Sequence, residues 1–238
     1  FHIPGYRMEP RGKAILPCNW LQVEDNILDP VHLSFLHTRS SGSQFLTEDG
    51  RPSNVFGILA ELDWMETPRG QIYIATRRIE NDVWVRMGEW IAPAHHIIPA
   101  HPNFPLSYPE GTDELYIRPK YTEWTVPIND TTSMNVGYRH VPESDTGPVI
   151  TNLATPYITD RTLEQKQRLP GDLEALEGQR PIAIHALEHL GATDRGVTHF
   201  RKLVKDGIRA VQMGQDPKGH TRDANNVTQT IASDTVLP

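Results

Sequence analysis

The chain has 238 residues, of which 37% are hydrophobic, and carries a formal net charge of −7. No apolar run approaches the ~20 residues that span a bilayer, no basic stripe could follow a phosphate backbone, and the single cysteine, Cys18, cannot form an internal disulfide. We therefore expect no membrane partner, no nucleic-acid partner and a cytoplasmic location. A chain of this length supports one substantial core, so we expect one domain covering residues 1–238.

A candidate metal motif lies between Asn26 and His37. Asp29, His32 and His37 stand in a D-x-x-H-x-x-x-x-H arrangement. Two imidazoles and a later carboxylate form the ligand set of a non-haem Fe(II) site, which leaves other coordination positions open. The motif therefore indicates iron binding.

The same segment has helical periodicity. At about 100° per residue, Asn26 and the three motif residues share one polar sector of the helical wheel. The opposite side is an apolar ladder of Val23, Ile27, Val31 and Phe35. We expect a helix with one packed face and one functional face. The alternative is an ordinary amphipathic helix that exposes its polar residues to water, with Asp29 as N-cap and Pro30 at the first helical position.

Alternating apolar positions predict an antiparallel sheet in the middle of the chain. The predicted strands are 54–64, 71–77 and 83–91, with turns at 68–70 and 80–82, followed by a hairpin of 121–128 and 133–141. Downstream, Thr193 or Asp194 can cap a helix that ends before Gly214. Its apolar positions are Val197, Phe200, Val204, Ile208 and Val211. Together these elements predict an α+β domain with the carboxy-terminal helix across the sheet.

Asp172 follows Pro170-Gly171 and, on its own, is typical of an exposed acid in a turn. Glu174 and Glu177 are neighbouring carboxylates that could be confused with it. Its sequence context nevertheless forms part of a wider pattern. The pattern comprises Asn19-Trp20-Leu21-Gln22 before the motif, Val126-Pro127-Ile128-Asn129-Asp130-Thr131-Thr132, Gln167-Arg168-Leu169-Pro170-Gly171-Asp172-Leu173-Glu174-Ala175, and Glu188-His189-Leu190-Gly191-Ala192-Thr193-Asp194-Arg195-Gly196-Val197.

In this order, these segments resemble the catalytic subunits of Rieske-type aromatic-ring oxygenases. The resemblance is to the branch with phthalate dioxygenase, vanillate-type demethylases and the dehydrodivanillate O-demethylase oxygenase. It implies a helix-grip (START-like) antiparallel sheet with a long carboxy-terminal helix. It also implies that His32, His37 and Asp172 are the iron ligands, that Asp29 hydrogen-bonds a ligand imidazole, and that Asn26 lines the approach.

The implied function is that of an oxygenase component. It would use mononuclear Fe(II) and O2 to hydroxylate or O-demethylate an aromatic compound, which we expect to be carboxylated. Electrons would come from NAD(P)H through a reductase or ferredoxin and a Rieske [2Fe–2S] cluster, and the assembly would be a homotrimer. That cluster needs two Cys and two His, which a chain with Cys18 alone cannot supply, so we expect the Rieske domain to lie amino-terminal to this chain.

Two other function classes remain open. A helix-grip domain could bind an apolar small molecule without catalysis, and His32 and His37 could serve a zinc hydrolase, although the chain lacks an H-E-x-x-H helix. Nothing in the sequence ranks the candidate partners for a substrate carboxylate, which are Arg77, Arg78, Arg118 and Arg139. The other histidines of interest are expected to be structural or at the surface, namely His95, His96, His101, His185 and His189.

Overall fold

The computed structural model describes residues 3–47, 49–100, 102, 111–112, 114–147, 161–226 and 229–238. The strands are β1 (Tyr6–Leu16), β2 (Glu61–Glu66), β3 (Gly70–Ile79), β4 (Asp82–Ile91), β5 (His95–Pro99), β6 (Leu115–Ile117), β7 (Pro119–Asn129), β8 (Thr132–Pro142) and β9 (Ser233–Leu237). The α-helices are α1 (Trp20–Ile27), α2 (His32–Ser34), α3 (Leu163–Arg168), α4 (Asp172–Gly178) and α5 (Arg195–Gln212). A π-helix covers Phe35–Arg39, and 3-10 turns cover Val55–Gly57, His185–Leu187 and Ala192–Asp194.

Within the described residues, the strands form one sheet of nine, in which every pair is antiparallel. The main order is β1-β8-β7-β5-β4-β3-β2. One end of β4 pairs with β5 and the other end with β9, which in turn pairs with β6. The predicted strands 71–77 and 83–91 and the hairpin of β7 and β8 are confirmed.

The predicted strand 54–64 is wrong over its first half. Val55–Gly57 forms a 3-10 turn, and the strand begins only at Glu61. Phe56 is 1% exposed because its ring packs against Trp84, with 5.0 Å between ring centroids, and so belongs to an aromatic cluster rather than to a sheet face. Ile58 and Leu59 are both exposed, so the alternation seen in the sequence did not reflect burial.

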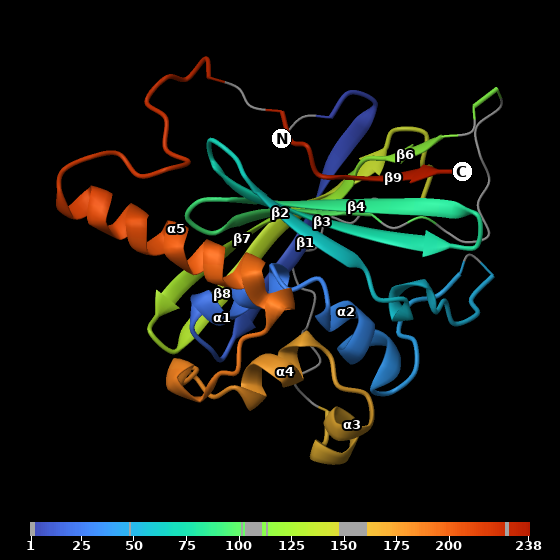
Figure 1. Cartoon of the computed structure of the whole chain (residues 1–238), viewed down its shortest axis with the longest axis horizontal. Helices are drawn as coiled ribbons and strands as arrows, with labels where there is room; N and C mark the ends of the chain where they lie inside the picture. The colour runs from blue at the N-terminus through green and yellow to red at the C-terminus, as the bar shows by residue number, and fades with distance from the viewer. Residues whose placement is uncertain are drawn as a thin grey trace.

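Helix α5 lies across the sheet as predicted (Figure 1). Its fully buried Phe200 meets Trp90 of β4 edge to face, with 4.8 Å between the ring centroids. At Gly196, an added Cβ would lie 1.9 Å from Nε1 of Trp64, so only glycine permits this approach of α5 to β2. The last turns of α5 do not continue the predicted apolar face, because Ile208 and Val211 are more than half exposed.

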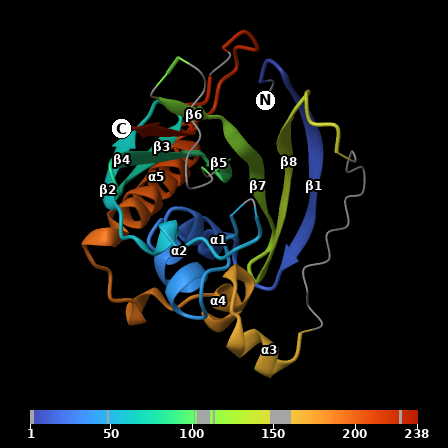
Figure 2. The ribbon, with the colours of Figure 1, turned by 90° about the vertical axis from the view of Figure 1, so that its right-hand side faces the viewer.

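The sheet curves around the helices. In Figure 2, α1 and α5 lie between the strands β2–β4 and the strands β7, β8 and β1. Helix α1 contacts both β7 and β8, so the metal motif that follows it is held inside the curve of the sheet. No described helix is long and apolar enough to cross a membrane.

We expect Phe200→Ala to lower the free energy of unfolding by about 3–5 kcal/mol, since it empties a fully buried aromatic site. The matched change Ile208→Ala, in the exposed part of the same helix, should alter it by less than about 0.5 kcal/mol. Urea unfolding of the two variants measures the difference, and equal losses would contradict the packing described for α5.

Candidate metal centre

The histidine motif is not one continuous helix. Helix α1 ends at Ile27, and Pro30 keeps the helix from continuing. A short α2 then leads into the π-helix Phe35–Arg39. The amide of Ser40 donates to the carbonyl of Phe35, five residues earlier. Within the predicted apolar ladder, Phe35 is 48% exposed, so the single-helix prediction is wrong at this end. His32 lies in α2 and His37 in the π-helix, so the two histidines are positioned by different turns and not by one α-helix.

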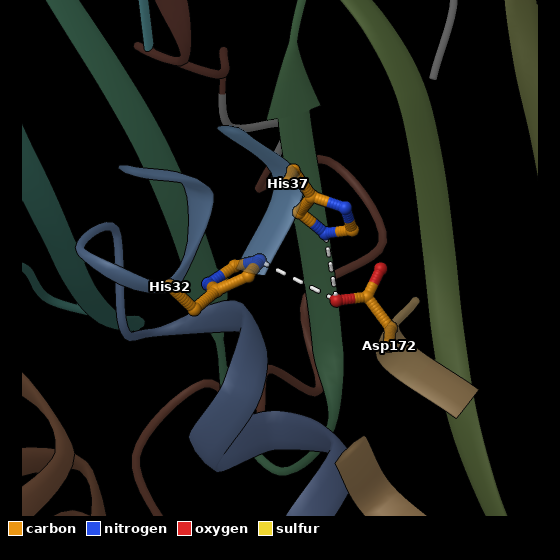
Figure 3. A group of neighbouring side chains, drawn as sticks. All are labelled: His32, His37 and Asp172. Carbon is orange, nitrogen blue, oxygen red and sulfur yellow. Dashed lines mark hydrogen bonds and ion pairs between the residues drawn. The ribbon is translucent and has the colours of Figure 1, made fainter. Parts of the chain in front are cut away.

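The structure brings His32, His37 and Asp172 together (Figure 3). One candidate ligand atom from each residue lies within 4.8 Å of the other two. Asp172 Oδ1 lies 3.0 Å from His37 Nε2 and 3.5 Å from His32 Nε2. Two segments 135 residues apart therefore present two imidazole nitrogens and one carboxylate oxygen to a common point.

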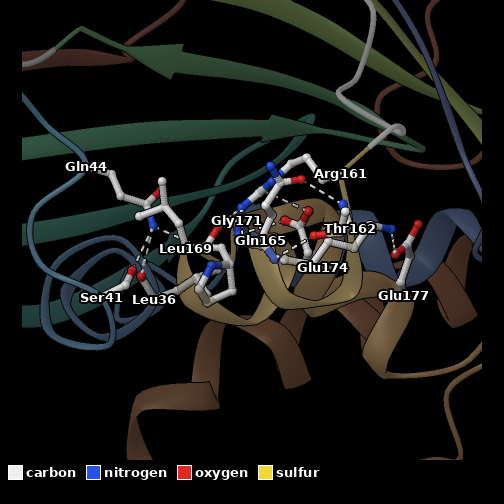
Figure 4. A network of polar contacts seen from close by, with 12 residues as sticks. Leu36, Ser41, Gln44, Arg161, Thr162, Gln165, Leu169, Gly171, Glu174 and Glu177 are labelled. Carbon is white, nitrogen blue, oxygen red and sulfur yellow. Dashed lines mark hydrogen bonds and ion pairs between the residues drawn. The ribbon is translucent and has the colours of Figure 1, made fainter.

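Asp172 is the first residue of α4, and α4 is anchored to α1 by an apolar contact. Leu173 and Leu176 pack with Val23 in a buried cluster. Both neighbouring acids have other partners. Glu174 accepts from Arg161 and from the backbone amide of Gly171, and Glu177 accepts from Lys166 at 2.8 Å (Figure 4).

Asn26 and Asp29 both contact the centre, but in different ways. Asn26 donates from Nδ2 to Oδ1 of Asp172 at 3.1 Å. The backbone carbonyl of Asp29, rather than its side chain, lies beside His32 Nδ1. The carboxylate instead accepts from the amide of Val31 at 2.9 Å, as a capping residue would.

The electrostatics of the centre favour an ionised Asp172. Desolvation opposes its charge, but the hydrogen bond from His37, the charges of both imidazoles and the hydrogen bond from Asn26 outweigh it and lower the pKa of Asp172 to about 2. Burial opposes the charge on His37, but its hydrogen bond and attraction to Asp172 raise its pKa above the ordinary value. A carboxylate that stays ionised where two imidazoles converge is the anionic donor that a bound divalent cation requires.

The residues present fit a mononuclear Fe(II). Each histidine has an acceptor at Nδ1, the carbonyl of Asp29 for His32 and the side chain of Gln44 for His37. Both Nε2 atoms are therefore left to face Asp172 and a metal. Two imidazoles and one carboxylate match the facial ligand set of non-haem iron enzymes.

A cavity of about 420 Å³ opens beside the three candidate ligands. Its wall is mainly apolar and comprises Ile27, Leu28, Leu33, Phe45, Phe56, Tyr73, Ile97, Ile98 and Pro99. The polar groups away from the metal centre are Arg86, Glu89, Lys120 and Tyr121. Neither His185 nor His189 lines this cavity.

The sequence did not identify the cations of the cavity. Arg86 and Lys120 line it, whereas none of the four arginines considered from the sequence does. Arg77 is buried over the ring of Trp84, and Arg139 is paired with Glu9. Gln44 was missed too, because it lies in a loop after Ser41 and Gly42 where no periodicity or motif marks it.

A buried charge cluster attaches α1 to the sheet. His96 of β5 is 1% exposed, its Nδ1 lies 3.4 Å from Glu24 of α1, and its Nε2 lies 3.5 Å from Glu123 of β7. Burial opposes the imidazolium, but the two carboxylates outweigh it and raise the pKa of His96 to about 9. His95 and His96 are thus structural as predicted, and both are buried rather than at the surface. His101 lies outside the described residues.

The sequence is homologous to oxygenase subunits. It is 31% identical over 226 residues to the tert-butanol monooxygenase / tert-amyl alcohol desaturase oxygenase subunit of Aquincola tertiaricarbonis, covering 84% of this chain and 46% of that protein. It is 30% identical to the phenoxybenzoate dioxygenase subunit alpha of Ectopseudomonas oleovorans, covering 88% and 47%. It is 26% identical to the 5,5'-dehydrodivanillate O-demethylase oxygenase subunit of a Sphingobium strain, covering 88% and 46%. A scan against protein-family models gives no match.

Solved structures agree on the fold. The QL mutant of NdmA from Pseudomonas putida CBB5 with theobromine superposes with a TM-score of 0.57 at 14% identity, covering 94% of this chain and 59% of that one. Dicamba monooxygenase bound to dicamba gives 0.54 at 12% identity, covering 90% and 61%. The chain belongs with the oxygenase subunits of Rieske-type oxygenases, and the resemblance seen in the sequence is confirmed. It spans about half the length of the curated relatives it matches.

We expect a pH dependence of stability from His96. Its folded pKa is raised, so its contribution is fully present below the unfolded value of about 6.5 and is lost as the pH rises through about 9. His96→Gln should be less stable than the unmodified protein at about pH 6.5. Its free energy of unfolding, measured in urea, should also fall less steeply towards about pH 10. In the control His95→Gln the fall should persist, since burial and the charge of His96 lower the pKa of His95 to about 4.

The three candidate ligands predict the metal content. His32→Ala, His37→Ala and Asp172→Ala should each remove most of the Fe(II) from protein loaded anaerobically, because each deletes one donor atom. Glu177→Gln, which changes a carboxylate held by Lys166, should retain the metal. Elemental analysis after gel filtration measures the iron content. Full iron occupancy in Asp172→Ala would show that Asp172 is not the carboxylate ligand.

Proposed function

We propose that this chain is the mononuclear-iron catalytic domain of an oxygenase component that hydroxylates or O-demethylates an aromatic carboxylate. The observation that carries the proposal is the convergence of His32, His37 and Asp172 at the end of a largely apolar cavity. Homology to oxygenase subunits supports it, and this homology disfavours both the simple binding domain and the zinc hydrolase.

The residues of the chain would divide the work. His32, His37 and Asp172 hold the metal, and Fe(II), when bound, supplies the redox chemistry with O2 that side chains lack. Asn26 restrains the Asp172 carboxylate through its 3.1 Å hydrogen bond. The apolar wall excludes water and places an aromatic ring or aryl ether beside the metal centre.

The substrate class follows from charge inside the cavity. Arg86 is paired with Asp234 at 3.3 Å, and its Nη2 donates to the carbonyl of Pro99 at 3.2 Å. Lys120 makes no ion pair among the described residues and lies 5.3 Å from the centre of the Tyr121 ring. Glu89, the acid of this wall, accepts from Thr230 at 2.6 Å, whereas Lys120 is an exposed cation of the lining. An ammonium without an ion pair beside a largely apolar cavity favours an anionic substituent over a neutral alcohol. We therefore place the substrate among aromatic acids rather than among tertiary alcohols of the kind named for one relative.

The wider assembly is part of the same proposal. Rieske-type electron delivery, a reductase or ferredoxin partner and a homotrimer are what relatedness to oxygenase subunits suggests. The helix-grip arrangement is supported by α5, which crosses the sheet and packs Phe200 onto Trp90. Under this proposal residues 1–238 form one catalytic domain, and Asp29 lies on the electron route to the metal.

The function is tested on the chain itself with hydrogen peroxide, which brings both oxygen and oxidising equivalents. Fe(II)-loaded protein mixed with a methoxybenzoate should give hydroxylated or demethylated product in a single turnover, and His37→Ala should give none. A protein that binds both iron and the aromatic acid yet forms no product would support the binding domain instead.

Substrate recognition is tested at Lys120. We expect Lys120→Met to weaken the binding of a methoxybenzoate about tenfold or more, as the loss of a hydrogen bond to a charged group implies. Binding of the corresponding methoxybenzamide should barely change, and Lys120→Arg should retain the preference for the acid. Calorimetric titration measures both variants and the unmodified protein, and equal binding of acid and amide by the unmodified protein would exclude an anionic substrate.

A further inference from the structure

Gln44 connects the two segments that supply the candidate ligands. Its Oε1 lies 3.0 Å from Nδ1 of His37, and its Nε2 donates to the carbonyl of Pro170 at 2.8 Å. Pro170 lies two residues before Asp172 in sequence. One amide side chain therefore contacts a candidate ligand on one side and the approach to another candidate ligand on the other.

The orientation of this amide is determined by its neighbours. Nε2 faces the carbonyl of Pro170 and, at 3.4 Å, the carbonyl of Leu36, and a carbonyl can only accept. The NH2 group must therefore point towards them, which leaves Oε1 facing His37. Because Oε1 can only accept, Nδ1 of His37 must carry a proton, and its Nε2 lone pair is left for a metal when the ring is neutral.

The loop before Asp172 depends on side chains for its backbone hydrogen bonds. Arg161 donates to the carbonyl of Leu169 at 2.5 Å, and Glu174 accepts from the amide of Gly171 at 2.8 Å. Both of these partners belong to the same part of the chain as Asp172. Gln44, in contrast, follows His37 in the sequence. Among the described residues it is the side chain from that part of the chain that donates to this loop.

We propose that Gln44 is a positioning residue of the metal centre, which fixes the tautomer of His37 and holds the Asp172 loop against it. The inference rests on the proposed iron site and adds the residue that holds the ligands in place before the metal binds. His32 needs no such residue, because the carbonyl of Asp29, three residues away, faces its Nδ1. His37 instead depends on a side chain that is also committed to a distant loop.

The chain contains a matched control. Gln71 has the same chemistry, with Oε1 2.6 Å from Nδ1 of His199 and Nε2 donating to the carbonyl of Gly196 at 3.0 Å. It also joins segments more than 120 residues apart, but it attaches β3 to α5 and does not line the cavity. Any effect of losing such a bridge on folding alone should appear in both glutamine variants.

The experiment measures Co(II) affinity as the substitute for Fe(II), by equilibrium titration of the metal-free protein. Gln44→Met, which removes both contacts, should weaken Co(II) binding about 10–100-fold. Gln44→Glu keeps an acceptor for Nδ1–H but loses the donor to the Pro170 carbonyl, so it should weaken Co(II) binding less than Gln44→Met does. Gln71→Met should leave Co(II) affinity unchanged even if it lowers the free energy of unfolding as much as Gln44→Met does.

A spectroscopic measurement separates tautomer control from general loosening. In the Zn(II)-loaded protein, nitrogen NMR should report a slowly exchanging Nδ1 proton on His37, which Gln44→Met should lose and Gln44→Glu should keep. Unchanged Co(II) affinity in Gln44→Met, or equal losses in Gln44→Met and Gln71→Met, would overturn the inference. Failure of the unmodified protein to bind metal through His32, His37 and Asp172 would instead overturn the proposed function.

Discussion

The structure depends on one constraint, namely that a carboxylate at Asp172 must meet two imidazoles supplied 135 residues earlier. Apolar packing of α4 on α1, through Leu173, Leu176 and Val23, brings the segments together but cannot orient them. Orientation comes from directional contacts, from Asn26 to the carboxylate itself and from Gln44 to the loop before it. The core thus sets the distance and the polar contacts set the geometry, as a preorganised metal site requires.

The sequence predicted those helices and strands in which apolar residues recur at regular spacing. Strands β3 and β4, the β7–β8 hairpin and helix α5 follow that rule. Strand β1 does not, because Glu9 is 1% exposed while Met8 and Ile15 are nearly half exposed. Its buried positions combine Glu9, which is paired to Arg139 across the sheet, with Ala14 and Leu16, and a bulge between Pro10 and Gly12 shifts the register, so a search for apolar alternation did not find it.

The same reasoning explains which parts of the site were predictable. His32 and His37 stand in a local motif that is visible without a structure. The choice of Asp172 over Glu174 came from family resemblance, and the structure gives it a physical reason, since Glu174 is engaged by Arg161. Gln44 left no sequence signal, because its partners are a ring nitrogen and a distant carbonyl. Contacts of this kind are specified by tertiary geometry and not by residue pattern.

The cavity wall also contains charge that the sequence could not place. Arg86 shares the buried carboxylate of Asp234 with the indole of Trp84, and Arg77 lies over the same Trp84 ring. Both terminal nitrogens of Arg77 lack a hydrogen-bond partner within the described residues, and burial lowers the pKa of Arg77 to about 10.

At neutral pH Arg77 therefore stays charged. Arg77 and Arg86 both lie over the Phe56 ring, and of the two it is Arg86 that forms the ion pair with Asp234. The resulting positive potential reinforces that of Lys120, because charges buried in a weakly polarisable interior are poorly screened. The metal centre, in contrast, contributes a carboxylate. Under the proposed function, a substrate with an apolar ring and one anionic substituent would turn its anionic group towards these cations and away from the Asp172 carboxylate.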